Sequence, residues 1–166
     1  MTRDEPSVSE VFSPDKVVTI LTIAGSDVDA DSVRSILNHS NWRVYEAHGQ
    51  EEALQILGAR TVAVVICEAN LPDGDWRTFL DRLTGMAEPP LLIVTSEQAD
   101  ERLWAEVLNL GAYDLIPRPF DQKEVIRIVS AAWLHWKGMR AELRRMGPAS
   151  EQNTAKPEPY RFAAHF

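Results

Sequence analysis

Three polar side chains stand at the ends of apolar runs, and their types limit the chemistry this chain can do. Glu68 follows one apolar run, Thr95 closes the next, and Arg118 lies just beyond a third. Carboxylate oxygens are the ligands that Mg²⁺ and Ca²⁺ prefer. A single carboxylate beside a guanidinium needs no such cation, because the guanidinium fork itself suits carboxylate binding. The outcome depends on how the intervening elements bring these ends together.

The middle of the chain alternates between strand-like and helical segments. The apolar, strand-like runs are residues 17–23, 42–47, 62–67, 90–95 and 113–116. The segments with helical spacing are residues 29–39, 50–57, 76–83, 98–110 and 121–146. This alternation predicts an α/β fold in which helices cover both faces of a parallel sheet. Functional loops in such sheets follow the carboxyl ends of the strands. Here those loops begin at Ala24, Glu68, Thr95 and Pro117.

Composition and charge exclude several classes of protein. The chain has 166 residues, a net charge of −8 and one cysteine, Cys67, which excludes an internal disulfide framework. No apolar stretch approaches the roughly 18 residues that a membrane span requires. Residues 17–136 carry nine basic and eighteen acidic side chains, a balance that argues against nucleic acid as a partner. Residues 1–16 are polar and acidic, unlike a secretory signal, so we expect a cytoplasmic protein.

The sequence divides into four parts. Residues 1–16 and 147–166 lack apolar periodicity, so we expect an N-terminal and a C-terminal tail. Residues 17–136 form the expected globular domain, and residues 137–146 extend its last helix. Twenty residues after that helix are too few for an output domain, so we expect a stand-alone protein.

Six motifs, in order, carry a resemblance to a known family. They are Ile20–Ile23 (ILTI), Asn41–Ala47 (NWRVYEA), Glu51–Leu54 (EEAL), Val64–Asp75 (VVICEANLPDGD), Leu92–Ser96 (LIVTS) and Gly111–Phe120 (GAYDLIPRPF). In their order and spacing these motifs resemble the response-regulator receiver domains, over about residues 17–136. The resemblance implies a flavodoxin-like fold: five parallel strands in the order 2-1-3-4-5, with five helices. It also implies a role in two-component signal transduction.

The sequence departs from that family where the family does its chemistry. Ala24 and Gly25 stand where the family has an acidic pair that binds magnesium. Glu68 occupies the position of the phosphate-accepting Asp. Thr95 matches the family's Thr or Ser, whereas Arg118 replaces its Lys. Two further positions of this family site are Leu115, where a switch aromatic is usual, and Pro119, whose peptide bond is cis in the family.

These departures predict a self-neutralised site in a degenerate receiver domain. We expect a direct or water-bridged contact between Glu68 and Arg118 in the place of metal and phosphate. The sequence therefore predicts no enzyme activity, no catalytic residues, no metal and no cofactor. The expected function is signalling through protein–protein contacts, without phosphorylation.

Two alternatives stay open. The first is a flavodoxin-like binding protein or enzyme that holds a flavin or nucleotide in the strand-end crevice. The chain lacks the glycines that usually cradle phosphate groups, which speaks against it. The second is a phosphorelay receiver in which Glu68 still accepts phosphate at an altered site.

Two surfaces are candidates for binding a partner protein. Trp104 lies in the helical segment 98–110, and the family binds partners through its fourth helix, fifth strand and fifth helix. The last helix carries apolar residues at heptad spacing. The members of this seam expected to contact a partner, including a second copy of the chain, are Trp136, Met139, Leu143 and Met146.

Overall fold

The computed structural model describes residues 17–25, 27–38 and 42–146. Its main sheet consists of β1 (Val18–Ile23), β2 (Trp42–Ala47), β3 (Val64–Glu68), β6 (Leu91–Ser96) and β7 (Asp114–Pro117). The helices are α2 (Asp27–Leu37), α3 (Gln50–Ala59), α4 (Trp76–Thr84), α5 (Glu101–Leu110) and α6 (Gln122–Met146). A small hairpin joins β4 (Asn70–Leu71) to β5 (Gly74–Asp75). Both predicted tails lie outside the described residues.

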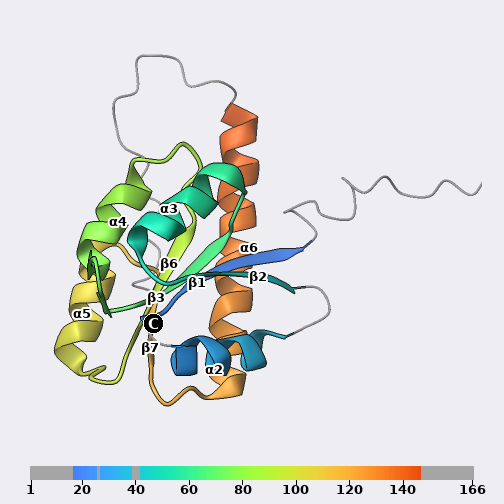
Figure 1. Ribbon diagram of the computed structural model, residues 1–166. Coiled ribbons are helices and arrows are strands. Elements are labelled where there is room, and N and C mark those ends of the chain that lie inside the picture. Colours follow the sequence, from blue (N-terminus) through green and yellow to red (C-terminus); the bar gives the residue numbers. More distant parts are fainter. Residues whose placement is uncertain (1–16, 26, 39–41, 147–166) are drawn as a thin grey trace, which may run out of the picture.

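All four pairings in the main sheet are parallel, and the strand order is β2-β1-β3-β6-β7. The predicted fold class and the 2-1-3-4-5 order are therefore confirmed. Each connection crosses over through a helix, as parallel pairing requires. Helices α3, α4 and α5 cover one face of the sheet, and α2 and α6 cover the other (Figure 1).

Strand alternation divides the interior into two hydrophobic clusters. Leu21 and Ile23 of β1 lie in the cluster under α3, α4 and α5, whereas Ile20 lies in the cluster under α2 and α6. Every residue of β1 is buried, as expected of a strand covered on both faces. Helix α5 begins at the N-cap Asp100 and ends at Gly111, whose φ of 104° is left-handed.

Between β3 and α4 the chain forms the β4–β5 hairpin, an element that the strand and helix periodicity of the sequence does not predict. Its Gly74 has a positive φ of 145°. A β-carbon at this glycine would lie 2.7 Å from Nε2 of the Gln50 side chain, so the hairpin packs directly on the start of α3.

The apolar seam of α6 is covered further along the helix than predicted. Trp136 is only 2% exposed and belongs to the core, so its predicted place on a partner surface is wrong. The domain covers the apolar seam as far as Trp136, and Met139, one turn further on, still packs against the cluster under α2 and α6. The Arg140 guanidinium lies 5.1 Å from the Trp136 ring and 3.8 Å from Glu88. These contacts hold the helix extension against the domain.

The last turn of α6 is uncovered in the structure. Leu143 is 39% exposed and Met146 is 72% exposed. These two residues therefore keep the surface position that the sequence predicts for them. No helix in the described ranges is both long and apolar enough to cross a membrane.

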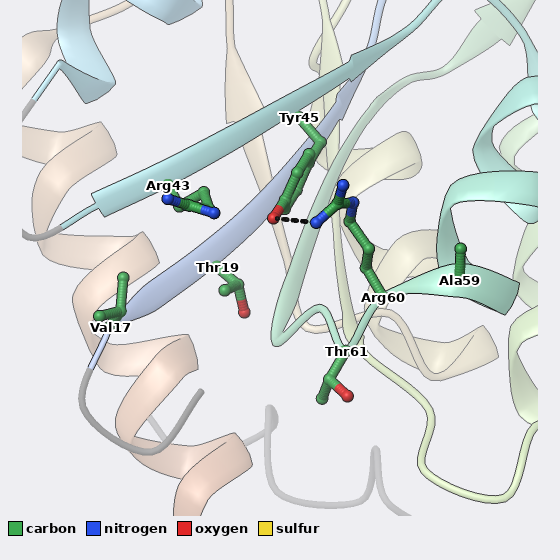
Figure 2. A pocket seen from close by; sticks show the side chains of 7 residues that line it. All are labelled: Val17, Thr19, Arg43, Tyr45, Ala59, Arg60 and Thr61. Atoms are coloured by element: carbon green, nitrogen blue, oxygen red, sulfur yellow. Dashed lines mark hydrogen bonds between the residues drawn. The ribbon is translucent and has the colours of Figure 1, made fainter. Parts of the chain in front are cut away.

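The amino-terminal edge of the sheet carries a hollow of about 230 Å³ (Figure 2). It lies where β1 and β2 begin and where the loop after α3 returns to the sheet. The residues that line it are Val17, Thr19, Arg43, Tyr45, Ala59, Arg60 and Thr61. This hollow is at the opposite end of the strands from the predicted functional loops.

Candidate functional site

The register of the sheet brings the predicted site residues to one edge. Ile23 pairs with Cys67, so the residues that follow them, Ala24 and Glu68, lie side by side. Glu68 in turn pairs with Thr95. The loop after β7 is tied to this edge, because the backbone N–H of Arg118 donates to the Ser96 carbonyl at 3.0 Å.

Glu68 is the centre of the site, and each of its carboxylate oxygens has a donor. Oε2 accepts a hydrogen bond from the backbone N–H of Gly25 at 3.1 Å. Oε1 accepts one from Arg118 Nη1 at 3.3 Å. The Glu68 side chain is only 12% exposed and the Arg118 side chain 16% exposed. The pairing expected from the sequence is thus present as a direct contact.

The length of the Glu68 side chain explains its reach across to the loop after β1. A β-carbon added at Gly25 would lie 3.5 Å from Glu68 Oε2, so the carboxylate occupies the space beside this backbone. Glu is one methylene longer than Asp, and that methylene carries the charge toward the loop. Ala24 is buried and supplies no side-chain oxygen here.

Thr95 and Leu115 lie on neighbouring strands but belong to different surroundings. Thr95 is 2% exposed, and its carbonyl accepts a hydrogen bond from the Ala69 N–H at 2.9 Å. Leu115 is 5% exposed and packs in the cluster under α3, α4 and α5, paired with Val94. An aliphatic side chain in this cluster has no polar group with which to contact the Thr95 hydroxyl.

The loop after β7 continues away from the Glu68–Arg118 pair. The Arg118–Pro119 peptide bond is cis, as the sequence resemblance implies. Beside it lies a hollow of about 540 Å³, whose lining comes from α2 and from the loops after β6 and β7. The lining residues are Ser32, Ile36, Glu97, Arg118, Pro119 and Phe120.

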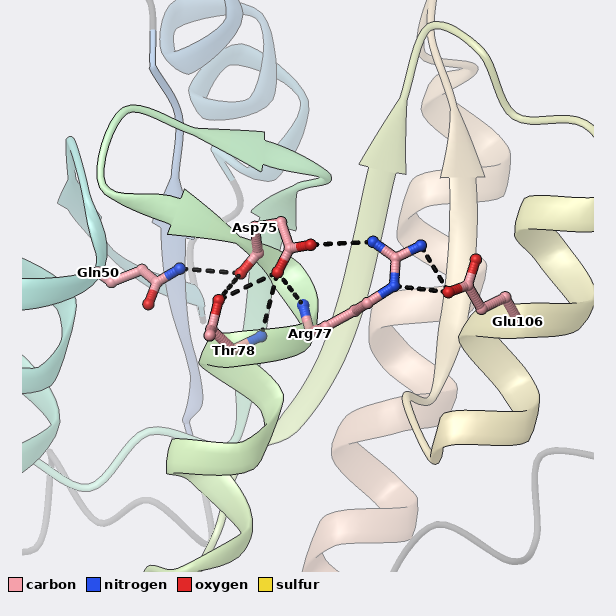
Figure 3. A network of polar contacts seen from close by, with 5 residues as sticks. All are labelled: Gln50, Asp75, Arg77, Thr78 and Glu106. Carbon is pink, nitrogen blue, oxygen red and sulfur yellow. Dashed lines mark hydrogen bonds and ion pairs between the residues drawn. The ribbon is translucent and has the colours of Figure 1, made fainter.

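A polar network next to the site was missed by sequence reasoning (Figure 3). Asp75 is the N-cap of α4, and its side chain accepts from the backbone N–H groups of Arg77 and Thr78. Gln50 Nε2 donates to the Asp75 carbonyl at 2.8 Å. Arg77 then reaches α5, where it donates to Glu106 and lowers the pKa of that carboxyl group. The N-cap was visible in the sequence as an acid before a helix, but its partners were not.

A second carboxylate fastens the hairpin to α3. Asp73 lies in the turn between β4 and β5, and its two oxygens accept from the N–H groups of Gln50, at 3.0 Å, and Glu51, at 3.3 Å. These donors belong to the first turn of α3, where N–H groups have no partner within the helix. Both hydrogen bonds lower the pKa of Asp73, and the bond from the Gln50 N–H has the larger effect.

Trp104 is partly buried rather than fully exposed. It packs against the cluster under α3, α4 and α5, and its side chain hydrogen-bonds Asp114 at the start of β7. Burial raises the pKa of Asp114 despite this hydrogen bond. The tryptophan therefore covers the edge of the core while part of its ring stays at the surface between α5 and β7.

Two findings concern metal and thiol chemistry. In the described ranges, no three or more His, Cys, Asp or Glu side chains cluster as a metal site would require. Cys67 is buried, and burial raises the pKa of its thiol. A thiol in this state is a core side chain rather than a nucleophile.

Comparison with protein families gives a match over most of the described chain. Residues 20–130 match the model of the response regulator receiver domain. The matched range begins in β1 and ends within α6. It therefore includes the whole sheet edge that carries Glu68, Thr95 and Arg118.

Similar proteins include regulators from bacteria and plants. The transcriptional regulatory protein CpxR of Klebsiella pneumoniae is 24% identical over 137 residues, which cover 81% of this chain and 58% of that protein. The two-component response regulator ORR5 of rice (Oryza sativa) is 27% identical over 115 residues, covering 67% of this chain and 85% of that protein. Among solved structures, the signal receiver domain of an HD domain-containing protein from Pseudomonas fluorescens Pf-5 has a TM-score of 0.70 and 26% identity. The match covers 78% of this chain and 95% of that one.

Proposed function

This chain belongs to the response regulator receiver domain family, and we propose that it signals by protein–protein contact without phosphorylation of its strand-end site. Family membership gives the coarse function, a receiver domain of two-component signalling. The finer statement depends on one observation. Both oxygens of the Glu68 carboxylate, at the position of the family's phosphate acceptor, are held by donors from this chain.

The first argument concerns the nucleophile. A carboxylate that accepts a phosphoryl group attacks the phosphorus with a lone pair of one oxygen, and hydrogen bonds to that oxygen reduce its nucleophilicity. Here Gly25 N–H and Arg118 each hold one oxygen of Glu68, and the charge of Arg118 lowers the electron density available for attack. The contacts that stabilise the carboxylate therefore oppose its phosphorylation.

The second argument concerns the cation that phosphoryl transfer uses. Mg²⁺ in such sites is held by carboxylate oxygens together with substrate phosphate oxygens. Ala24 and Gly25 supply no side-chain oxygen after β1, and Glu68, the carboxylate that the described side chains place at this edge, is neutralised by Arg118. The residues present do not fit a divalent cation, so the proposed mechanism contains no metal-dependent step.

The third argument concerns how a site reports its state. In the family a hydroxyl and an aromatic side chain are expected to couple the site to the partner surface. Leu115 is aliphatic and already packed in the core, so no ring is available to move toward Thr95. We propose that this chain presents one fixed receiver surface to its partner.

We assign the partner contact to the surface formed by α5, β7 and α6. Trp104 contributes the exposed part of its ring, and Leu110 at the end of α5 is 52% exposed. A second copy of the chain, bound through Leu143 and Met146 of α6, is the alternative arrangement. We place this signalling in the cytoplasm.

The experiment is phosphorylation of the full chain by a small phosphoryl donor. Purified protein is incubated with acetyl phosphate and MgCl₂, and the intact mass is measured. We expect no added phosphoryl group on the wild-type chain. A stoichiometric adduct on Glu68 would overturn the proposal and establish the phosphorelay alternative.

A matched variant shows that the assay can detect phosphorylation in this scaffold. The quadruple substitution Ala24→Asp, Gly25→Asp, Glu68→Asp and Arg118→Lys restores the residues that the family uses. We expect this variant to gain a phosphoryl group that alkali or hydroxylamine removes, as an acyl phosphate requires, while the single substitution Glu68→Asp does not. Visible absorbance of the purified wild-type protein separately tests the flavodoxin-like alternative, because a bound flavin absorbs in that range.

A further inference from the structure

We propose that Arg77 is a positioning residue that holds α5 in one place on the domain, through Glu106. The inference rests on the proposed function, because it assumes that the partner contact uses α5. It adds the means by which that surface stays fixed in a chain where Leu115 stands at the position of the family's switch aromatic. In this arrangement the hairpin after β3, rather than Thr95 and Leu115, sets the position of α5.

Helix α5 has little apolar anchorage of its own. All 10 residues of α5 are described, and Val107 is the one that is buried. Leu103 and Trp104 pack against the cluster under α3, α4 and α5 but are only partly buried. The buried residues of the neighbouring helix α4 are Trp76, Phe79, Leu80 and Leu83. A helix with so few buried apolar side chains depends more on polar contacts to keep its position.

The hairpin after β3 fixes the start of α4 to the main sheet. Ala69 directly follows Glu68, and its N–H donates to the Thr95 carbonyl at 2.9 Å. The Ala69 carbonyl accepts a hydrogen bond from the Trp76 N–H at 3.0 Å, and the Trp76 side chain is buried. The first residue of α4 is therefore held both by the backbone at the Glu68 edge and by the core.

Asp75, the N-cap of α4, orients the Arg77 side chain. Asp75 Oδ1 accepts from the N–H groups of Arg77 and Thr78, each at 3.2 Å, and Oδ2 accepts from Arg77 Nη1 at 3.0 Å. The guanidinium carbon also lies 4.9 Å from the centroid of the Trp76 ring. One carboxylate and one ring thus hold the guanidinium, and Figure 3 shows its opposite edge turned toward α5.

That opposite edge binds Glu106 of α5. Arg77 Nε and Nη2 each lie 2.5 Å from Glu106 Oε1. The contact with Glu106 raises the pKa of Arg77, and the contact with Arg77 lowers the pKa of Glu106. Hydrogen bonds between two charged groups are shorter and stronger than those between neutral groups. Because all three guanidinium nitrogens are engaged, Arg77 fixes the spacing between α4 and α5.

Glu106 is placed to control the exposed part of α5. Leu110, which is 52% exposed, lies four residues after Glu106 and therefore on the same face of the helix, one turn further on. Trp104 ties another face of α5 to β7 through its hydrogen bond with Asp114. Arg77 and Trp104 thus hold α5 from two sides, and loss of Arg77 releases the side that faces α4.

A second arginine of α4 provides a matched control. Arg82 Nη1 lies 2.7 Å from Glu51 Oε1, and this pair joins α4 to α3 instead of α5. The two arginine side chains have similar exposure, 42% for Arg77 and 48% for Arg82. Replacing either arginine by Gln removes an interhelical ion pair from the same helix, so the two variants differ chiefly in which neighbouring helix loses its contact.

The test is ¹⁵N relaxation dispersion on the full chain, which detects conformational exchange on the microsecond-to-millisecond timescale. We expect no exchange contribution at residues 101–110 or at the Trp104 indole in the wild-type chain. Arg77→Gln and Glu106→Ala should each introduce exchange at these positions and shift the Trp104 indole signal. The double variant should show no more exchange than a single variant, since both changes remove the same contact. Arg82→Gln should leave α5 as it is in the wild-type chain.

Three results would overturn the inference. They are exchange in α5 of the wild-type chain, no exchange in Arg77→Gln and Glu106→Ala, or equal exchange in Arg82→Gln, which would indicate general loosening of the domain. The acetyl phosphate experiment on the wild-type chain is scored separately. A phosphoryl group on Glu68 together with the expected exchange pattern would refute the proposed function and leave the role of Arg77 standing.

Discussion

The two ends of the parallel sheet handle charge in opposite ways. At the carboxyl ends, Glu68 and Arg118 are nearly buried and neutralise one another. At the amino ends, Arg43 and Arg60 face a hollow whose described lining contains no acid. The first pair is held inside the protein by contacts between its own side chains, whereas Arg60 lies at an exposed surface.

This difference separates two uses of an arginine in one small domain. Arg118 contacts Glu68 within the same chain, so this contact contributes to the free energy of unfolding. The Arg60 side chain is exposed and contacts the Tyr45 hydroxyl at 3.4 Å and the Tyr45 ring at 5.0 Å, so it belongs to the surface of the domain. The comparison predicts that equivalent substitutions will lower stability strongly at the Glu68 end and weakly at the Arg60 end.

Arg118→Ala should have the largest effect on stability. It leaves the Glu68 carboxylate, 12% exposed, with one donor fewer, and we expect the free energy of unfolding to fall by about 2 kcal/mol. Urea denaturation followed by circular dichroism measures this loss. Adding Glu68→Gln removes the unpaired charge and should recover part of it. Equal stability of the single variant and the wild type would show that the pair contributes nothing.

Glu68→Asp should have the next largest effect. The shorter side chain keeps the charge but cannot hold both Gly25 N–H and Arg118, so we expect a loss of about 1.5 kcal/mol. The same denaturation assay checks it. The amide of Gly25 should also shift in a ¹⁵N NMR spectrum; an unchanged amide would mean that the length of Glu68 is not what brings it to this loop.

Asp73→Ala tests a carboxylate at the carboxyl end of the sheet through the pH dependence of stability. Loss of the hydrogen bonds to the first turn of α3 should cost about 1 kcal/mol at pH 7. The folded-state pKa of Asp73 is lowered from 3.8, so its stabilisation is complete well above that pH and is lost as the pH falls through the folded-state value. The difference between variant and wild type should therefore shrink in acid. A difference that stays constant from pH 7 to about pH 2 would contradict this assignment.

Arg60→Gln should have the smallest effect on stability. Its side chain is exposed, and surface substitutions of this kind change the free energy of unfolding by less than about 0.5 kcal/mol. Thermal unfolding of this variant beside the wild-type chain checks this figure. A loss as large as that of Arg118→Ala would remove the distinction between the two ends.

Sequence reasoning succeeded where periodicity and local chemistry decide the structure. The five long strands and five helices lie within a few residues of their predicted bounds, because apolar runs and helical spacing mark them directly. The Glu68–Arg118 contact was also predictable, since parallel strands bring their carboxyl ends to one edge.

Sequence reasoning failed where the decisive contact joins distant segments. The heptad pattern of α6 continues without change past Trp136, so it does not reveal where the domain stops covering the helix. The hollow joins Arg43 to Arg60 through the pairing of β1 with β2 and the anchor at Thr19. In the sequence, this hollow is indicated only by the spacing of Arg43 and Tyr45, which places them on one face of a strand, and by Arg60 after a predicted helix.

The network around Asp75 has a consequence for how the molecule opens. It ties the first turn of α4 to α3 through Gln50, and to α5 through Arg77 and Glu106 (Figure 3). Helices joined in this way do not fray one at a time, because opening one breaks contacts of the next. In native-state hydrogen exchange, amides of α3, α4 and α5 should therefore exchange as one cooperative unit, and Arg77→Ala should divide that unit in two.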